Sequence, residues 1–203
     1  DISYRNLAIV AELASRYPLQ VHPLLANHEL AQCHRMSVSK GGGDQVAMFD
    51  DGLDYVFNDR AEEVATAIRE FILAMPLVLR AENGLWCSHS VPGRMDFDDS
   101  AFDRALVLED YQSPSGTAWC MVWGRLQDPT HIQALLKRFD AKLFVVGHCH
   151  AEMGIESPVD GLVVINSDHA RGVVVSIELS KPLPSADEIM KSAMPLVLYR
   201  ALS

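Results

Sequence analysis

The chain has 203 residues, of which 49% are hydrophobic and 22% charged, as expected of a globular protein with a buried core. The net charge of −10, from 17 Lys and Arg against 27 Asp and Glu, argues against nucleic acid or an anionic membrane as a partner. The sequence has no apolar run near the roughly 20 residues of a membrane span. The four cysteines form no C-x-x-C pair, which excludes a zinc-ribbon pattern and fits a cytoplasmic protein.

The apolar spacing predicts helices and strands that are mixed along the chain. Helices are expected at 6–17, 58–74, 100–110 and 128–139. Strands are expected at 21–26, 77–80, 85–88, 142–146, 161–166 and 172–179. The last three strands are continuous in Val, Ile and Leu, which is typical of strands covered on both faces. The pattern therefore predicts an α/β domain with layered sheets.

Side chains that could carry chemistry recur where apolar runs end. They are Asp1, Asn27, His28, His89, His148, His150, Asp168 and His169. Strand ends are where ligand sites assemble in layered α/β folds, because rigid strands hold exposed loops there. Imidazole, carboxylate and amide groups together suit Mn, Fe, Zn or Mg. A lone histidine after a strand is more often a surface or hydrogen-bonding residue, which is the interpretation for His22, His34 and His131.

The pair His148 and His150 follows a buried strand with one residue between them. Alternate residues of an extended segment point to opposite sides, so both imidazoles reach one site only if the chain turns. Gly147 is expected to permit that turn.

Four short motifs, in order, resemble those of the calcineurin-like metallophosphoesterases. DISYRN (1–6) resembles the G-D-x-x-D-R motif from its aspartate onward, and LLANHEL (24–30) resembles G-N-H-[ED]. LWCSHSVPG (85–93) looks like the strand that ends in a metal-binding histidine, and VVGHCH (145–150) matches G-H-x-H. The resemblance covers about residues 1–180. It is closest to the bacterial branch similar to serine/threonine protein phosphatases and diadenosine-tetraphosphate hydrolases.

The resemblance implies an α/β fold, a layered α-β-β-α sandwich of two mixed sheets flanked by helices. A single metallophosphoesterase domain would span 1–203, with 181–203 as a C-terminal extension. The family's D-x-H motif would precede Asp1, so the chain is expected to be truncated and to lack its first strand.

The resemblance also assigns a dinuclear metal site. Asp1 would bridge two divalent ions, with manganese favoured and Fe, Zn or Mg admitted. Asn27, His89 and His148 would complete one metal site, and His150 would belong to the other. Metal-bound hydroxide would be the nucleophile.

His28 would be the catalytic acid that protonates the leaving group, and Arg5 and Arg125 would bind phosphate oxygens. The implied activity is hydrolysis of phosphomonoesters, with phosphoserine or phosphothreonine of proteins among the candidate substrates. The alternatives are a hydrolase of dinucleoside polyphosphates or nucleotides, and a degenerate, non-catalytic scaffold of the same fold.

Four positions depart from the family pattern. Tyr4 stands where an aspartate usually orients the catalytic histidine, and its hydroxyl could hydrogen-bond imidazole without the full charge of a carboxylate. Ala26 replaces the glycine before Asn27, and Ser90-Val91 replace glycines after His89. These replacements would strain the backbone if the positions required positive φ.

Overall fold

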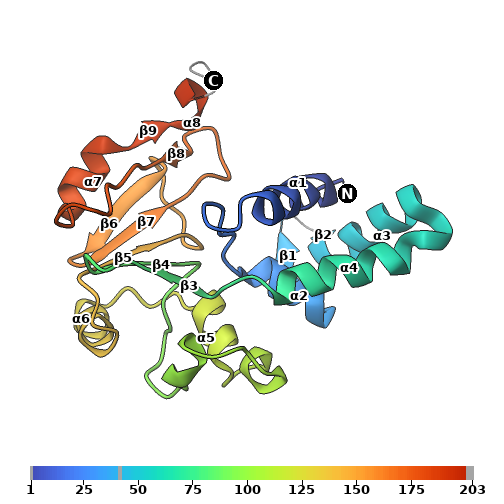
Figure 1. The fold of residues 1–203 in the computed structure, drawn as a ribbon, viewed down its shortest axis with the longest axis horizontal. Helices are drawn as coiled ribbons and strands as arrows, with labels where there is room; N and C mark the ends of the chain where they lie inside the picture. The colour runs from blue at the N-terminus through green and yellow to red at the C-terminus, as the bar shows by residue number, and fades with distance from the viewer. Residues whose placement is uncertain (1, 41–42, 200–203) are drawn as a thin grey trace. The chain divides into compact units, whose positions relative to one another are not determined.

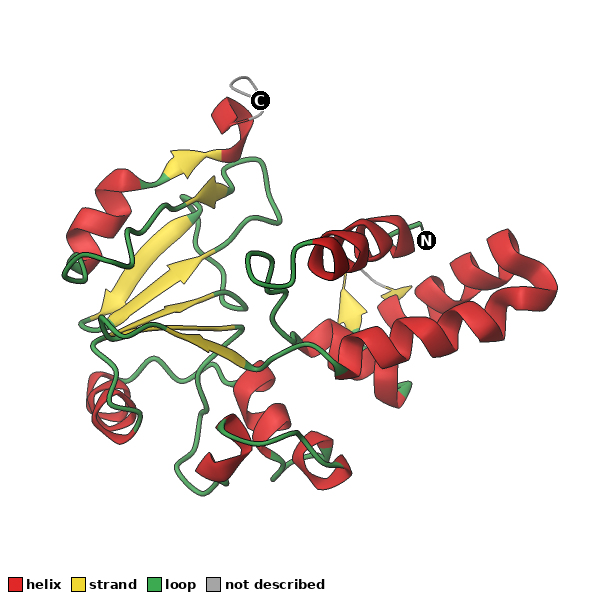
Figure 2. Cartoon of the chain, viewed as in Figure 1, coloured by secondary structure: helices red, strands yellow, loops and turns green. Residues whose placement is uncertain are grey.

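The computed structural model describes residues 2–40 and 43–199. The chain divides into two compact units, Asp1–Pro76 and Leu77–Ser203. The first unit is mostly helical and the second contains the main sheet (Figures 1 and 2). Within the described ranges, the helices are too short or too polar to cross a membrane.

The first unit consists of helices around a small apolar core. Its elements are α1 (Tyr4–Arg16), α2 (Asn27–His34), β1 (Ser39–Lys40), β2 (Gly43–Asp44), α3 (Gln45–Phe57), the 3₁₀ turn η1 (Asn58–Arg60) and α4 (Ala61–Leu73). The two short strands pair antiparallel. The Asp44 carboxylate then caps α3 by accepting the N–H groups of Val46 and Ala47, which satisfies donors that the first helical turn leaves open.

The predicted helices at 6–17 and 58–74 are confirmed as α1 and as η1 with α4. The predicted strand at 21–26 is wrong, because these residues have no regular structure. Pro23 has no N–H to donate, and the Leu25 N–H bonds the Pro76 carbonyl at 2.9 Å instead of a strand ladder.

The second unit is built on a five-stranded mixed sheet. Its strands are β3 (Val78–Arg80), β4 (Leu85–Ser88), β5 (Leu143–Val146), β6 (Ile155–Val159) and β7 (Leu162–Ile165), in the order β3-β4-β5-β7-β6. β4, β5 and β7 run parallel, and β3 and β6 pair antiparallel at the edges. The predicted α/β class, with a mixed sheet flanked by helices, is confirmed.

Helices and loops cover the sheet. The remaining elements are the 3₁₀ turns η2 (Asp99–Phe102) and η3 (Leu108–Tyr111), then α5 (Thr117–Trp123), α6 (Pro129–Arg138), β8 (Val173–Val174), α7 (Ala186–Ser192), β9 (Met194–Pro195) and α8 (Leu196–Tyr199). One helix was predicted at 100–110, and two 3₁₀ turns form there. The predicted strand at 172–179 pairs only at β8, with β9.

Alternation along β5 places its side chains in two cores. Phe144 is fully buried and lies near Trp86, which stacks on Phe139 with ring centroids 4.5 Å apart. Leu143 packs in a second cluster with Val163 and with Ile189 of α7. Both faces of the sheet are therefore buried, which fixes the register of the parallel strands and the points where they end.

Candidate metal centre

Three loops leave the sheet at the same edge, because β4, β5 and β7 are parallel neighbours. His89 follows β4, and Gly147 and His148 follow β5. The Gly147 N–H donates to the His89 carbonyl at 3.1 Å, which joins the first two loops one residue beyond the strands. Residues 166–169 follow β7 (Figure 1). This edge is the standard location for ligand sites in open α/β sheets.

The imidazoles of His89 and His148 meet at this edge. Nε2 of His89 lies 3.0 Å from Nδ1 of His148, and the ring centroids are 4.8 Å apart. His148 has φ 61, in the left-handed region, whereas Arg35, Asn58 and Asp140, with similar φ, lie within two residues of a helix C-terminus. Histidine adopts this region more often than most side chains, and strain of this kind gathers at functional sites.

The turn after β5 is thus made by His148 and not, as the sequence suggested, by Gly147. A Cβ at Gly147 would lie 3.7 Å from the carbonyl oxygens of His89 and Ile165, which is ordinary contact. The backbone conformation of His148 itself therefore aims its ring toward His89.

The loop that carries His89 is anchored to α5. The hydroxyl of Ser90 donates to the Met121 carbonyl at 2.6 Å and accepts the N–H of Gly124 at 3.1 Å. A Cβ at Gly124 would lie only 1.7 Å from the Val91 carbonyl oxygen, so the two segments approach as closely as glycine allows. Ser90 therefore ties the His89 loop to the end of α5.

The departures from the family pattern are compatible with this backbone. Ala26 has φ −123, and neither Ser90 nor Val91 is among the non-glycine residues with positive φ in the described ranges. No sequence pattern predicted α5, so the contact of Trp123 with His148, at 6.2 Å between ring centroids, could not be expected.

His150 is exposed and lies beside His169, with ring centroids 5.5 Å apart. Nδ1 of His169 accepts the N–H of Arg171 at 3.1 Å, so its Nε2 carries the proton and donates to the Ala151 carbonyl at 3.0 Å. Both nitrogens of His169 are engaged with the backbone. His169 is therefore a clamp between the loops after β5 and β7 and not a metal ligand in this arrangement.

The donor set of His89 and His148 fits a divalent cation. Metal–imidazole bonds of about 2.0–2.1 Å place two ligand nitrogens about 3.3–3.4 Å apart in tetrahedral coordination. At the right angles of octahedral coordination they lie about 2.8–3.0 Å apart. The observed separation of 3.0 Å between the two nitrogens agrees with this right-angle value. An N–H···N hydrogen bond has the same length. Across 2–40 and 43–199, no three His, Cys, Asp or Glu side chains gather into a metal site. Further ligands would have to come from amide oxygens, water or residues outside these ranges.

The other predicted site residues are distributed as follows. Asn27, which is 6% exposed, and the half-buried His28 begin α2 in the first unit. Arg5 is exposed on α1, and its Nε donates to the Tyr4 hydroxyl at 3.3 Å. Arg125 is exposed and follows Gly124 in the second unit. Asp1 lies outside the described residues.

Comparison with known proteins gives a likeness of fold. No protein-family profile and no curated protein sequence matches the chain. A solved structure, a protein serine/threonine phosphatase from Saccharomyces cerevisiae with similarity to human phosphatase PP5, is similar with a TM-score of 0.58 and 15% identity. The match covers 84% of this chain and 56% of that one, so the chain spans little more than half of its length. The fold is therefore one that a serine/threonine phosphatase also has.

Proposed function

We propose that the chain is a metal-dependent phosphoesterase that hydrolyses phosphomonoesters. The observation that carries the proposal is the 3.0 Å approach of His89 Nε2 to His148 Nδ1 at the C-terminal edge of parallel strands. The likeness of fold to a serine/threonine phosphatase supports it. Phosphoproteins and small phosphomonoesters are both proposed substrates.

His89 and His148 would hold one divalent ion, with Asn27 as the amide ligand. His150 and Asp1 would contribute to a second ion. Such ions, when bound, supply positive charge for the phosphate oxygens and lower the pKa of a water molecule. The roles of Asp1 and Asn27 are proposed from the sequence motifs.

His28 would donate a proton to the leaving-group oxygen, which is worth roughly 10²–10⁴-fold in rate. Arg5 and Arg125 would bind the phosphate through their guanidinium groups, whose planar donors match phosphate oxygens. The Tyr4 hydroxyl accepts from Arg5, so Tyr4 would orient this arginine rather than supply a charge to His28.

Metal binding tests the proposal without relying on turnover. The protein would be loaded with Co²⁺, and its visible absorption would be recorded for the parent, His89→Ala and His148→Ala. Both variants are expected to lose the histidine-ligated spectrum, because each removes one nitrogen of the pair. His22→Ala is the matched control, since His22 is exposed in a segment without regular structure. An unchanged spectrum in both site variants would refute the metal centre.

Turnover of p-nitrophenyl phosphate then tests the reaction. His28→Ala is expected to retain metal and to lose roughly 10²–10⁴-fold in kcat, as removal of a general acid does. Stoichiometric metal without turnover would favour the scaffold alternative. Faster hydrolysis of diadenosine tetraphosphate than of phosphomonoesters would favour the nucleotide alternative.

A further inference from the structure

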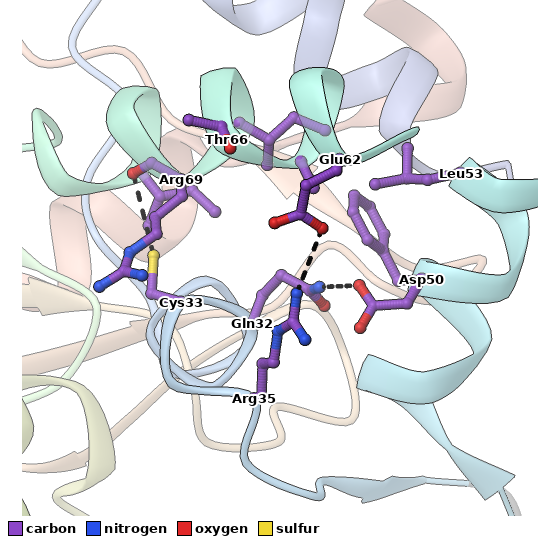
Figure 3. A pocket seen from close by; sticks show the side chains of 12 residues that line it. Gln32, Cys33, Arg35, Asp50, Leu53, Glu62, Thr66 and Arg69 are labelled. Atoms are coloured by element: carbon purple, nitrogen blue, oxygen red, sulfur yellow. Dashed lines mark hydrogen bonds and ion pairs between the residues drawn. The ribbon is translucent and has the colours of Figure 1, made fainter. Parts of the chain in front are cut away.

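A pocket of about 150 Å³ lies within the first unit among α2, α3 and α4 (Figure 3). Its apolar lining includes Leu53 and Ile72, which are 2% and 1% exposed, together with Phe49, Ala65 and Ile68. A cavity of about this volume accommodates a molecule the size of benzene. The floor of the pocket therefore fits one short, branched apolar group.

Polar pairs connect the three helices around this floor. The Gln32 side chain donates from Nε2 to Asp50 Oδ1 at 2.6 Å, which joins α2 to α3. Arg35 Nη2 lies 3.6 Å from Glu62 Oε2, which joins the end of α2 to α4. Figure 3 shows Arg35 and Glu62 facing each other across the pocket. The ligand environment thus combines an apolar floor with charges of both signs.

The ion pair of Arg35 and Glu62 is loose. Its 3.6 Å separation exceeds hydrogen-bond length, and the two side chains are 72% and 82% exposed. Exposed pairs of this kind contribute little to stability, so both groups can exchange partners at small cost. A simple anion beside Arg35 would also face Glu62 and Asp50, and a simple cation would face Arg35 and Arg69, which line the same pocket.

We propose that this pocket binds a small zwitterion, a free amino acid with a short branched apolar side chain such as leucine or valine. Its carboxylate would bind the Arg35 guanidinium, and its ammonium group would bind Glu62 or Asp50. The apolar side chain would lie against Leu53 and Ile72. A zwitterion replaces the loose ion pair with two charge-assisted contacts. Its carboxylate would face the positive Arg35, and its ammonium group would face a negative carboxylate.

The same pocket provides a means of regulation, an inference that rests on the proposed function. α2 begins with Asn27 and His28 and ends at His34, and the next residue, Arg35, terminates the helix with a φ of 50. An eight-residue helix is about 12 Å long and moves as one body. A ligand that ties Arg35 to α4 would therefore restrain the helix that starts with the proposed metal ligand and proton donor.

Isothermal titration calorimetry with L-leucine tests the binding. Saturable heat is expected with L-leucine, and much weaker heat with isovalerate, which lacks the ammonium group, and with isopentylamine, which lacks the carboxylate. Glycine, which lacks the apolar group, should also bind weakly. Equal affinity for isovalerate and leucine, or no saturable heat with leucine at millimolar concentration, would overturn the proposal.

Variants locate the binding. Arg35→Gln and Glu62→Gln should each weaken leucine binding by about tenfold or more, since each removes a charge-assisted contact. Arg60→Gln is the matched control, because Arg60 pairs with Glu63 at 2.9 Å and does not line the pocket. Equal losses in Arg60→Gln and Arg35→Gln would place any binding elsewhere and overturn the assignment.

The regulatory part is tested by titrating L-leucine into the p-nitrophenyl phosphate assay. Turnover should change with the same midpoint as the calorimetric binding, and Arg35→Gln should shift both midpoints together. An active protein that binds leucine without any change in turnover would overturn the regulatory part. Absence of turnover in the parent would refute the phosphoesterase proposal instead, because the calorimetric result does not depend on activity.

Discussion

Nε2 of His169 donates to the carbonyl oxygen of Ala151 at 3.0 Å. With its second bond, from the Arg171 N–H to Nδ1, His169 holds the loop after β5 against the loop after β7. The loop after β5 carries His148 and His150. His169 is not a proposed ligand, but it therefore restrains the loop that carries two proposed ligands, His148 and His150.

His169→Ala should lower metal affinity by about 10- to 100-fold, as the loss of supporting hydrogen bonds around a metal site does. Competition with a chelator would measure the affinity, and circular dichroism would establish that the variant is folded. His22→Ala should leave the affinity unchanged. A folded His169→Ala variant with parental affinity would show that the clamp has no influence on the site.

Gly124→Ala should destabilise the protein by at least about 2 kcal/mol, because the new Cβ would overlap the Val91 carbonyl oxygen. Gly93→Ala is the matched control, since its Cβ would meet nothing closer than 3.9 Å. Urea unfolding would compare the two variants. Equal urea midpoints for the two variants would show that the close approach of α5 to the His89 loop is not required for stability.

The Arg104 guanidinium forms two hydrogen bonds to the buried Asp110 carboxylate, at 2.6 and 2.9 Å. These bonds, first among the causes, lower the pKa of Asp110. Since the folded-state pKa is depressed, the stabilisation is complete above the unfolded value of about 3.9 and is lost as pH falls through the folded-state value.

Asp110→Asn should therefore reduce stability at neutral pH and flatten the loss of stability below about pH 4. Thermal unfolding between pH 2 and 7 would give both curves, since the unfolded carboxyl titrates at about 3.9 within that range. Curves for parent and variant that run parallel through the acid range would contradict a depressed pKa at this carboxyl.

Burial raises the pKa of the thiols of Cys33 and Cys87 to about 11. At pH 8 about one molecule in a thousand would carry either thiolate, so alkylation by iodoacetamide should be slow and should rise about tenfold per pH unit. Mass spectrometry of peptides would measure it, with urea-unfolded protein as the control. Rapid modification of either thiol in the folded protein at pH 8 would contradict this.

Local patterns were sufficient to predict several elements. Helix α6 is confirmed, with Pro129 in its first turn and the Asp128 side chain accepting the His131 N–H. The Asn83-Gly84 turn joins β3 to β4, two strands that the sequence predicted, and Gly84 has φ 97. In each case the residues that determine the conformation are within a few positions of one another.

Other elements were not found because their structure depends on distant contacts. Residues 21–26 have the composition of a strand but pair with none of the strands in the described ranges. In α5, buried residues point to so many sides that no helical period is visible. The single-domain organisation expected for 1–203 stays a prediction, as do the site roles of Asn27, His28, Arg5 and Arg125.

The sequence by itself determined which residues have side chains that can bind a metal ion or transfer a proton. It placed His89 and His148 at the ends of apolar strands and fixed the chemistry of their side chains. The tertiary structure decided that these residues, 59 positions apart, approach to 3.0 Å and that His148 makes the turn. It also assigned His169 to the backbone instead of to a metal. The physical reason is that parallel pairing of β4 with β5 and β5 with β7 aligns loops from distant parts of the chain, and no local pattern encodes that alignment.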